Sequence, residues 1–188
     1  MVGAGSRLAE RTGAEWGMIA PGAAACLCHA TAACVTGGDP ELMFHLPDTS
    51  AMKNKVVMHR DSRFTYDHAI RSVGVTVVEV RSLSEMTDAL DGDRVAMVAL
   101  LGTWETEAEI SLEQVVEIDR TKGSTNGIDE DSEHVSSTEK YTRRGEKIVA
   151  YSGGKYKRGP KATGLVVGER EVVEDGWVHD ATDHTLGR

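Results

Sequence analysis

A lysine in a glycine-rich segment has the most distinctive chemical setting in this sequence. Residues 147–152 have the composition of a β-strand, and Gly153 and Gly154 then permit a tight turn in front of Lys155. At the carboxyl end of a parallel strand, such a lysine lies where α/β sheets bind ligands. Its amine can form a Schiff base when the surroundings lower its pKa. On this local chemistry alone, a solvated basic turn is the favoured interpretation.

A second candidate site opens the first predicted buried helix. The run Ala20-Pro-Gly-Ala-Ala-Ala25 places small residues where that helix begins. Backbone N–H groups at a helix N-terminus attract anions, and small side chains let a phosphate approach them closely. A simple Pro-Gly turn that leads into a core helix explains the same residues equally well.

A third group of candidates is acidic. Four acidic residues fall within residues 129–133, and the first of them, Asp129, precedes Lys155 by 26 positions (155 − 129). No local rule distinguishes Asp129 from Glu130, Asp131 or Glu133. A solvated acidic loop is the alternative interpretation.

Strand and helix patterns alternate along the chain and determine where these candidates lie. Strands are predicted at 55–59, 75–80, 94–101, 147–152 and 162–167. Helices are predicted at 22–35, 66–73, 84–90 and 111–122, and residues 6–12 have the pattern of a helix end. The continuous apolar run 94–101 is typical of a central parallel strand covered on both faces. The alternation predicts βαβ units and a mostly parallel sheet flanked by helices.

Two segments do not fit this alternation. Residues 39–52 contain Pro40 and Pro47 and are predicted to be irregular. Residues 123–144 are polar throughout apart from Ile128 and Val135, so a long exposed loop is predicted where a strand is due. Such a loop is uncommon inside a compact domain and points to function or disorder.

Composition limits the classes of partner. The chain has 188 residues and a net charge of −9, which argues against a nucleic-acid partner because phosphate binding needs a basic face. Neither a secretory signal nor an apolar run of about 18 residues is present, so a cytoplasmic protein without a membrane partner is expected. The three cysteines, Cys26, Cys28 and Cys34, lie in one Ala-rich helix and are expected to be small buried residues.

Several segments together resemble one enzyme family. They are Leu46-Pro-Asp-Thr49, residues 52–57, residues 66–71, Tyr151–Pro160 and the tail 184–188. These segments resemble the selenocysteine synthase-like group of pyridoxal 5′-phosphate (PLP) enzymes, in the branch that contains D-glucosaminate-6-phosphate ammonia-lyase. The pattern Ser-Gly-Gly-Lys-x-x-Arg-Gly-Pro, from Ser152 to Pro160, is its most specific part.

The resemblance implies a fold and a domain organisation. It implies the α/β fold of fold-type I, aspartate aminotransferase-like enzymes, with residues 1–188 as a partial PLP-binding large domain. An N-terminal segment and a C-terminal small domain of the family are absent from these residues. A homodimer or larger assembly is expected by analogy with this fold.

The resemblance also implies roles for individual residues. Lys155 matches the Schiff-base lysine, and Asp129 matches the partner of the pyridinium nitrogen. Gly22, Ala23 and Ala24 match the loop that holds the cofactor phosphate, and Ser152, Arg158 and Gly159 belong to the cofactor loop around Lys155. A further segment borders the ring and the substrate without individual roles, and it contains His59, Arg60, Arg63 and His68.

The implied reaction is an α,β-elimination on a small amino acid or amino sugar phosphate, with Lys155 or a neighbouring histidine as general base. The alternatives are an L-seryl-tRNA(Sec) selenium transferase and a catalytically inactive remnant of the fold. The sequence departs from the family at Pro21, where a hydroxyl residue would help to bind phosphate, and at Glu130 and Asp131, whose charges beside a cofactor would be costly if desolvated.

A dinucleotide site and a metal site are less well supported by the sequence than the PLP site. Gly3-Ala-Gly5 is a weak dinucleotide-binding motif, because no strand precedes it and the third glycine is absent. His59, Asp61 and His68 could form a metal site, but no pattern of residues that would hydrogen-bond to these ligands accompanies them, so no metal is expected.

Overall fold

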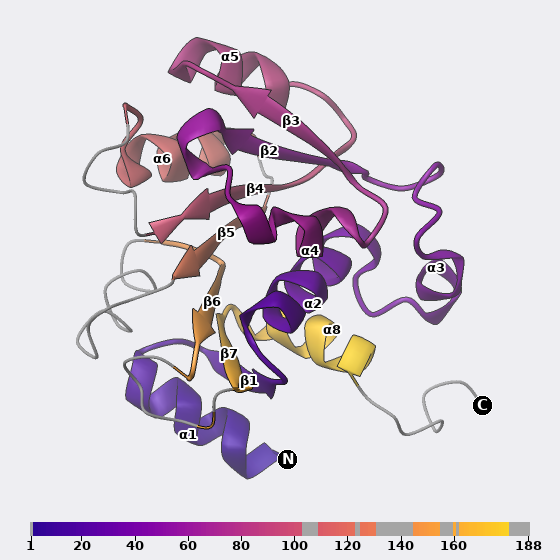
Figure 1. Cartoon of the computed structure of the whole chain (residues 1–188), viewed down its shortest axis with the longest axis vertical. Helices are drawn as coiled ribbons and strands as arrows, with labels where there is room; N and C mark the ends of the chain where they lie inside the picture. Colours follow the sequence, from indigo (N-terminus) through magenta and orange to yellow (C-terminus); the bar gives the residue numbers. More distant parts are fainter. Residues whose placement is uncertain are drawn as a thin grey trace.

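The strands that the structure describes form a single seven-stranded sheet. The computed structural model describes residues 2–102, 109–122, 125–130, 145–154, 160 and 162–180. Within them the strand order is β1-β7-β6-β5-β4-β2-β3 (Figure 1). The strands are β1 (Trp16–Ala20), β2 (Lys55–His59), β3 (Thr76–Val80), β4 (Val95–Leu101), β5 (Thr125–Glu130), β6 (Ile148–Ser152) and β7 (Gly164–Gly168).

The direction of the strands decides which of their ends meet. Strands β3, β2, β4, β5 and β6 are parallel, whereas β7 is antiparallel to both β6 and β1. The two reversals make β1 run in the same direction as β6. The carboxyl ends of β1 and of all five parallel strands therefore lie at one edge of the sheet, which is the edge where open α/β sheets bind ligands.

Helices cover both faces of the sheet. The helix α2 (Ala23–Thr36) crosses one face, with α8 (Arg170–Asp180) and α4 (His68–Arg71) beside it. The opposite face is covered by α5 (Leu83–Leu90) and α6 (Leu112–Lys122). The helix α1 (Val2–Thr12) packs on β1, the short helix α3 (Pro40–His45) follows α2, and two 3-10 turns, Arg60–Ser62 and Thr65–Asp67, precede α4.

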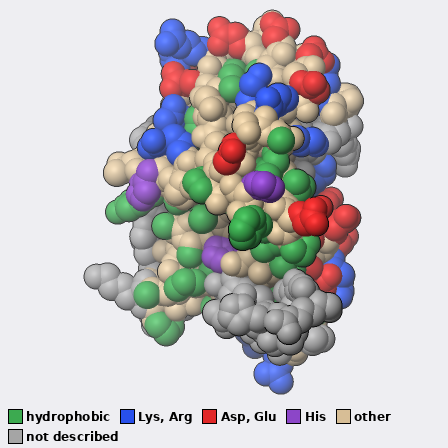
Figure 2. All heavy atoms as spheres, turned by 90° about the vertical axis from the view of Figure 1, so that its right-hand side faces the viewer, with side chains coloured by type: hydrophobic (Ala, Val, Ile, Leu, Met, Phe, Trp, Pro, Cys, Tyr) green, Lys and Arg blue, Asp and Glu red, His purple; other side chains and the backbone are tan. Residues whose placement is uncertain are grey.

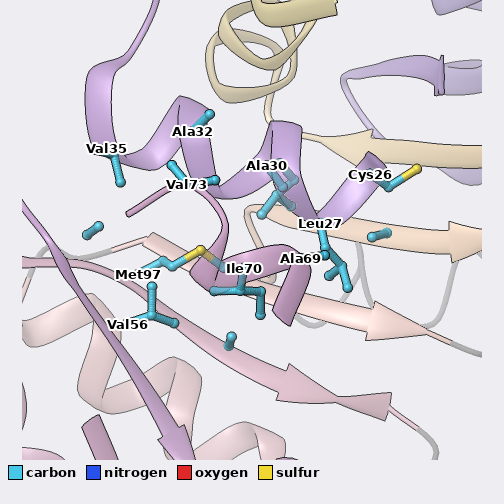
Figure 3. Packing of buried hydrophobic residues seen from close by; sticks show 14 of the residues in the cluster. Cys26, Leu27, Ala30, Ala32, Val35, Val56, Ala69, Ile70, Val73 and Met97 are labelled. Atoms are coloured by element: carbon cyan, nitrogen blue, oxygen red, sulfur yellow. The ribbon is translucent and has the colours of Figure 1, made fainter. Parts of the chain in front are cut away.

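The central helix α2 is apolar around most of its circumference, and it can therefore be buried between the sheet and other helices. Leu27 and Ala30 pack in one cluster with Ile70 of α4 and Met97 of β4 (Figure 3). The helix ends at Gly37, whose φ is 57° and whose N–H donates to the Ala33 carbonyl oxygen at 2.8 Å. The predicted helix at 22–35 is therefore confirmed to within one residue at each end.

The largest correction concerns the polar segment that was predicted to be a loop. Its residues 125–130 form β5 in the middle of the sheet, where Asp129 pairs in register with Leu101 on β4 and with Ala150 on β6. Backbone pairing on both sides places this strand although Ile128 is its one apolar residue, because tertiary context outweighs a weak strand propensity. The rest of the segment, residues 131–144, lies outside the described residues.

Smaller corrections involve short or mixed patterns. Residues 40–45 are helical, because Asp39 caps this turn by accepting from the N–H of Glu41 at 2.9 Å and Pro40 occupies its first position. The helix predicted at 66–73 is a 3-10 turn followed by the short α4. The strand predicted at 162–167 is the antiparallel β7. Strand β1 and helix α8 were not predicted.

No helix in the described part of the chain combines the length and the apolar character needed to cross a bilayer. The described cysteines are unoxidised, with Cys26 buried and Cys28 and Cys34 half-buried.

Candidate functional site at the carboxyl edge of the sheet

Two of the predicted site segments meet across a single residue, Gly164. This glycine opens β7 and pairs in register with Ala20 at the end of β1 and with Ser152 at the end of β6. The turn that starts α2 follows Ala20 directly, and the Lys155 segment follows Ser152 directly. The sheet register therefore brings together two sequence motifs that are about 130 residues apart in the chain.

The first turn of α2 has the properties of an anion-binding site. Gly22 is its N-cap with φ 104° and ψ 165°, and no side chain caps the helix. The Gly22 N–H donates to the Ala20 carbonyl oxygen at 2.8 Å, and the Gly22 carbonyl oxygen accepts from Cys26 at 3.1 Å. Ala24 is exposed and Ala23 half-buried, and their amides lie in the first turn of a helix, where N–H groups have no intrahelical acceptor and attract anions.

The segment that carries the lysine leaves β6 and returns to β7 at the same edge. The Gly153 N–H donates to the Thr163 carbonyl oxygen at 2.7 Å, and Thr163 in turn donates to the Pro160 carbonyl oxygen at 3.0 Å. Neighbouring β6 side chains alternate between the faces, with Ala150 on the α2 side and Tyr151 on the α6 side. This alternation places Ser152 on the α2 side. Lys155, Arg158 and Gly159 lie outside the described residues, which reach Gly154.

Asp129 occupies the strand next to β6 at the same edge. The register places its backbone beside Ala150, two residues before Ser152. Its predicted pairing with a cofactor nitrogen stays a prediction.

His59 is the last residue of β2 and has an orphaned ring nitrogen. The side chain is buried, and its Nδ1 accepts from the Asp61 N–H at 3.3 Å. The Nε2 atom is buried and has no hydrogen-bond partner within the described ranges. A buried unpaired donor or acceptor costs about 1–3 kcal/mol, so a polar group from outside these residues is expected to meet it.

His59 is nevertheless separate from Ser152. Strands β4 and β5 lie between β2 and β6, which corresponds to three strand spacings or about 14 Å. By alternation from Val57, which packs on the α5 side, His59 also faces away from α2. The structure thus places His59 at the same edge of the sheet as Gly22 and Ser152, but not beside them.

The remaining predicted substrate residues are each held by neighbouring acidic or backbone groups. Arg60 is half-exposed and lies 3.4 Å from Asp61 and 3.7 Å from Glu109. Arg63 donates to the buried Asp67 at 2.5 Å and to Glu79 of β3 at 3.2 Å. His68 lies with its Nδ1 3.1 Å from the Thr65 carbonyl oxygen.

Asp67 is a residue that the sequence analysis missed. It is buried and accepts from Arg63 and also from Arg71, whose Nε lies 3.1 Å from Oδ1. The spacing of four residues on either side of Asp67 is a signal that could have identified this cluster. Its tight internal pairing indicates that Arg63 helps to fix the 60–71 segment.

The possible metal site of His59, Asp61 and His68 does not form, because the three side chains do not come together. His59 Nδ1 lies 3.4 Å from Asp61, while His68 is bonded to Thr65. Among the residues that the structure describes, no group of three or more His, Cys, Asp and Glu side chains could hold a metal ion.

A second polar cluster lies where α8 packs on the far end of α2. His179 Nε2 lies 2.9 Å from Thr36 Oγ1 and 3.3 Å from the Gly37 carbonyl oxygen. Burial lowers the pKa of His179, as does the nearby His29, while the bond to Gly37 raises it. A pocket of about 270 Å³ adjoins this cluster and is lined by Cys28, His29, Leu46, Ser72 and His179, among others.

Apolar and charged side chains gather in different parts of one face of the molecule (Figure 2). Hydrophobic side chains gather in the middle and lower parts of the face in Figure 2, with histidines between them. Charged side chains crowd its upper end.

Comparisons with known proteins identify the fold. No family model matches the sequence. A 5′-C-glycyluridine monooxygenase-decarboxylase from a Streptomyces species is 30% identical over 184 residues, which cover 90% of this chain and 45% of that protein. The structure of D-glucosaminate-6-phosphate ammonia-lyase matches with a TM-score of 0.84 at 24% identity, over 93% of this chain and 49% of the other.

More distant solved structures agree. The PLP-dependent protein YhfS from Escherichia coli matches with a TM-score of 0.68 at 15% identity, over 94% of this chain and 45% of that one. The chain therefore has the fold of fold-type I PLP-dependent enzymes, and it spans about half the length of the proteins it matches.

Proposed function

We propose that this chain contains the cofactor-binding part of a PLP-dependent enzyme, with Lys155 as the residue that carries PLP covalently. The observation that supports this most strongly is the meeting of the uncapped start of α2 with the end of β6 across Gly164. The chain shares its fold with PLP-dependent enzymes, which supports this edge of the sheet as the place where the cofactor would bind.

The residues at this edge fit the groups of PLP. The Gly22 turn, with the backbone amides of Ala23 and Ala24, would hold the phosphate, since the amides at a helix start carry partial positive charge and no side chain caps this helix. Ser152, at the end of β6, pairs with Gly164, which on its other side pairs with Ala20 just before this turn. Asp129, one strand further along, would pair with the pyridine nitrogen and keep it protonated. When bound, PLP supplies a ring that accepts electrons from the α-carbon of an amine.

The α-proton of a small amine substrate would be taken by Lys155. A lysine beside the cofactor is preferred to His59 as the base, because His59 is only 2% exposed and faces away from α2. The half-exposed guanidinium of Arg60 is the stronger candidate for the substrate side of the site, and the same burial and orientation count against His59. Arg63 and His68 are the weaker candidates, because Asp67 and Thr65 already hold them.

The proposed reaction is α,β-elimination on a small amino acid or an amino sugar phosphate. Its support is the similarity in fold to D-glucosaminate-6-phosphate ammonia-lyase. A second candidate is oxygen-dependent decarboxylation of an amino acid attached to a nucleoside, which is favoured by the 30% identity to the glycyluridine enzyme. Selenium transfer to a seryl-tRNA is disfavoured by the net charge of −9.

The protein is also proposed to work as a homodimer. Phe44 on α3 is 87% exposed and Ile19 on β1 is 52% exposed, which supports contact with another subunit. Light scattering of the purified chain at several concentrations tests this, and a monomer throughout would contradict it.

The cofactor proposal is tested by titrating the chain with PLP and recording the visible absorbance, beside a Lys155→Ala variant. We expect a visible aldimine band, at longer wavelength than the band of free PLP, that saturates in the wild type and is absent in the variant. Absence of the band in both would favour the inactive-remnant alternative. With the band present, release of ammonia from candidate amines supports elimination, whereas carbon dioxide release with oxygen uptake supports the decarboxylase.

A further inference from the structure

We propose that Gly164 is a positioning residue for the cofactor phosphate, because its missing side chain lets the Gly22 turn lie against the start of β7. The inference rests on the proposed function, in which that turn binds the phosphate. A Cβ atom placed on Gly164 would lie 2.5 Å from the carbonyl oxygen of Gly22 and 2.6 Å from its carbonyl carbon, and it would also overlap Cys26 Sγ.

Space, and not backbone conformation, requires glycine at this position. Gly164 is not among the described glycines with positive φ, so alanine could adopt its backbone angles. Real Cβ atoms essentially never approach other atoms within 3.0 Å, and ordinary contacts begin at 3.4 Å. An alanine at 164 must therefore displace one of its neighbours by about 1 Å.

The Gly22 turn is the neighbour that can move. Gly164 is held on both sides by its register with Ala20 and Ser152, inside a continuous sheet. Gly22 is half-buried and lies in a turn between β1 and α2, with solvent on its outer side. A side chain at 164 would push this turn away from the end of β6, and with it the amides that are proposed to bind the phosphate.

The opposite end of the same strand provides a matched control. A Cβ atom on Gly168 would overlap the Lys147 carbonyl oxygen and lie 2.9 Å from Ile148 Cα. Gly168 also lacks a positive φ. It pairs with Trp16 and Ile148, at the amino ends of β1 and β6, far from the Gly22 turn. Gly168→Ala therefore strains β7 by a similar backbone collision without touching the proposed cradle.

The experiment compares the affinities of PLP and of pyridoxal, which lacks the phosphate, in the wild type, Gly164→Ala and Gly168→Ala. Affinities are measured by absorbance titration, and folding by thermal unfolding. We expect Gly164→Ala to lose at least about tenfold in PLP affinity, with pyridoxal affinity within about twofold of wild type, because a displacement of 1 Å removes well-placed contacts. Gly168→Ala should lower the melting temperature and leave the ratio of the two affinities unchanged.

The outcomes separate this inference from the proposed function. A wild-type chain that binds no PLP contradicts the proposed function itself. A wild type that prefers PLP, with a folded Gly164→Ala that keeps the same preference, contradicts only the role of Gly164. If Gly164→Ala does not fold, adding Cys26→Ala removes the sulfur overlap and leaves the Gly22 collision, so the double variant should still show the reduced preference; an unreduced preference would overturn the inference.

Discussion

The two ends of the carboxyl edge of the sheet are stabilised in different ways. Near β1, β7 and β6, backbone contacts hold the Gly22 and Gly153 turns against β7, and the first turn of α2 has no side-chain cap. Near β2 and β3, Arg63 and Arg71 pair with the buried Asp67, and Arg63 also pairs with Glu79. At the β2 end, these charged side chains pair with one another. At the β1 end, the backbone N–H groups in the first turn of α2 have no side-chain partner, as an anion site requires.

This comparison predicts that Asp67→Ala has the largest effect on stability and a small effect on cofactor affinity. Removing a buried carboxylate breaks two ion pairs. Because both arginines keep access to solvent, we expect the lower end of the cost of breaking a buried pair, a loss of about 3 kcal/mol in the free energy of unfolding. Urea denaturation measures this loss. PLP affinity should stay within about twofold of the wild type.

Asp67→Asn is the control for this variant, because its amide oxygen can still accept from one arginine. We expect it to lose about 1.5 kcal/mol, roughly the value of a hydrogen bond to a charged group. A large drop in PLP affinity in a folded Asp67→Ala protein would show that the two ends of the edge are not independent.

Ala24→Glu tests the other end of the edge, with the next largest effect. Ala24 is exposed in the first turn of α2, where a carboxylate interacts favourably with the helix dipole and would stabilise the fold by about 0.3–1 kcal/mol. The same carboxylate would repel a phosphate. We expect PLP affinity to fall about tenfold, which corresponds to about 1.4 kcal/mol.

Ala24→Gln provides the uncharged comparison of similar size, measured by the same PLP titration. If Gln weakens binding as much as Glu, bulk and not charge is responsible. If neither variant weakens binding, the phosphate does not lie at this turn.

The sequence predicted well what depends on continuous apolar patterns. The buried strand at 94–101 and the helix at 22–35 were identified because almost all of their side chains are apolar. Composition predicted a loop at β5, where the alternation called for a strand, because its residues other than Ile128 are polar; pairing with Leu101 and Ala150 makes it a central strand.

The candidate site was predictable in part from the sequence. Gly22 and Ser152 were identified from local motifs, but their meeting point at Gly164 depends on β1 and on the antiparallel direction of β7. Short segments such as Trp16–Ala20 predict neither the presence of β1 nor the direction of β7. Likewise, the orphaned Nε2 of His59 depends on burial that no local pattern encodes.

The smallest predicted effect lies away from the edge and concerns pH. Since burial lowers the pKa of His179 in the folded state below its ordinary value of 6.5, the unfolded chain binds the proton more tightly. The stabilisation is therefore present above pH 6.5 and is lost as the pH falls through the folded-state pKa. His179→Gln should remove this part of the pH dependence, as measured by urea midpoints at about pH 7.5 and 5.5. An equal change in urea midpoint between the two pH values in both proteins would contradict this prediction.

The most direct test of the central claim is to locate the covalent attachment of PLP. The chain is incubated with PLP, reduced with borohydride and digested, and the modified peptide is identified by mass spectrometry. The account predicts one stoichiometric adduct on Lys155, abolished by Lys155→Ala. Adducts distributed over Lys147, Lys157 and Lys161, or retained in the variant, would show surface reaction instead and would contradict the proposed site.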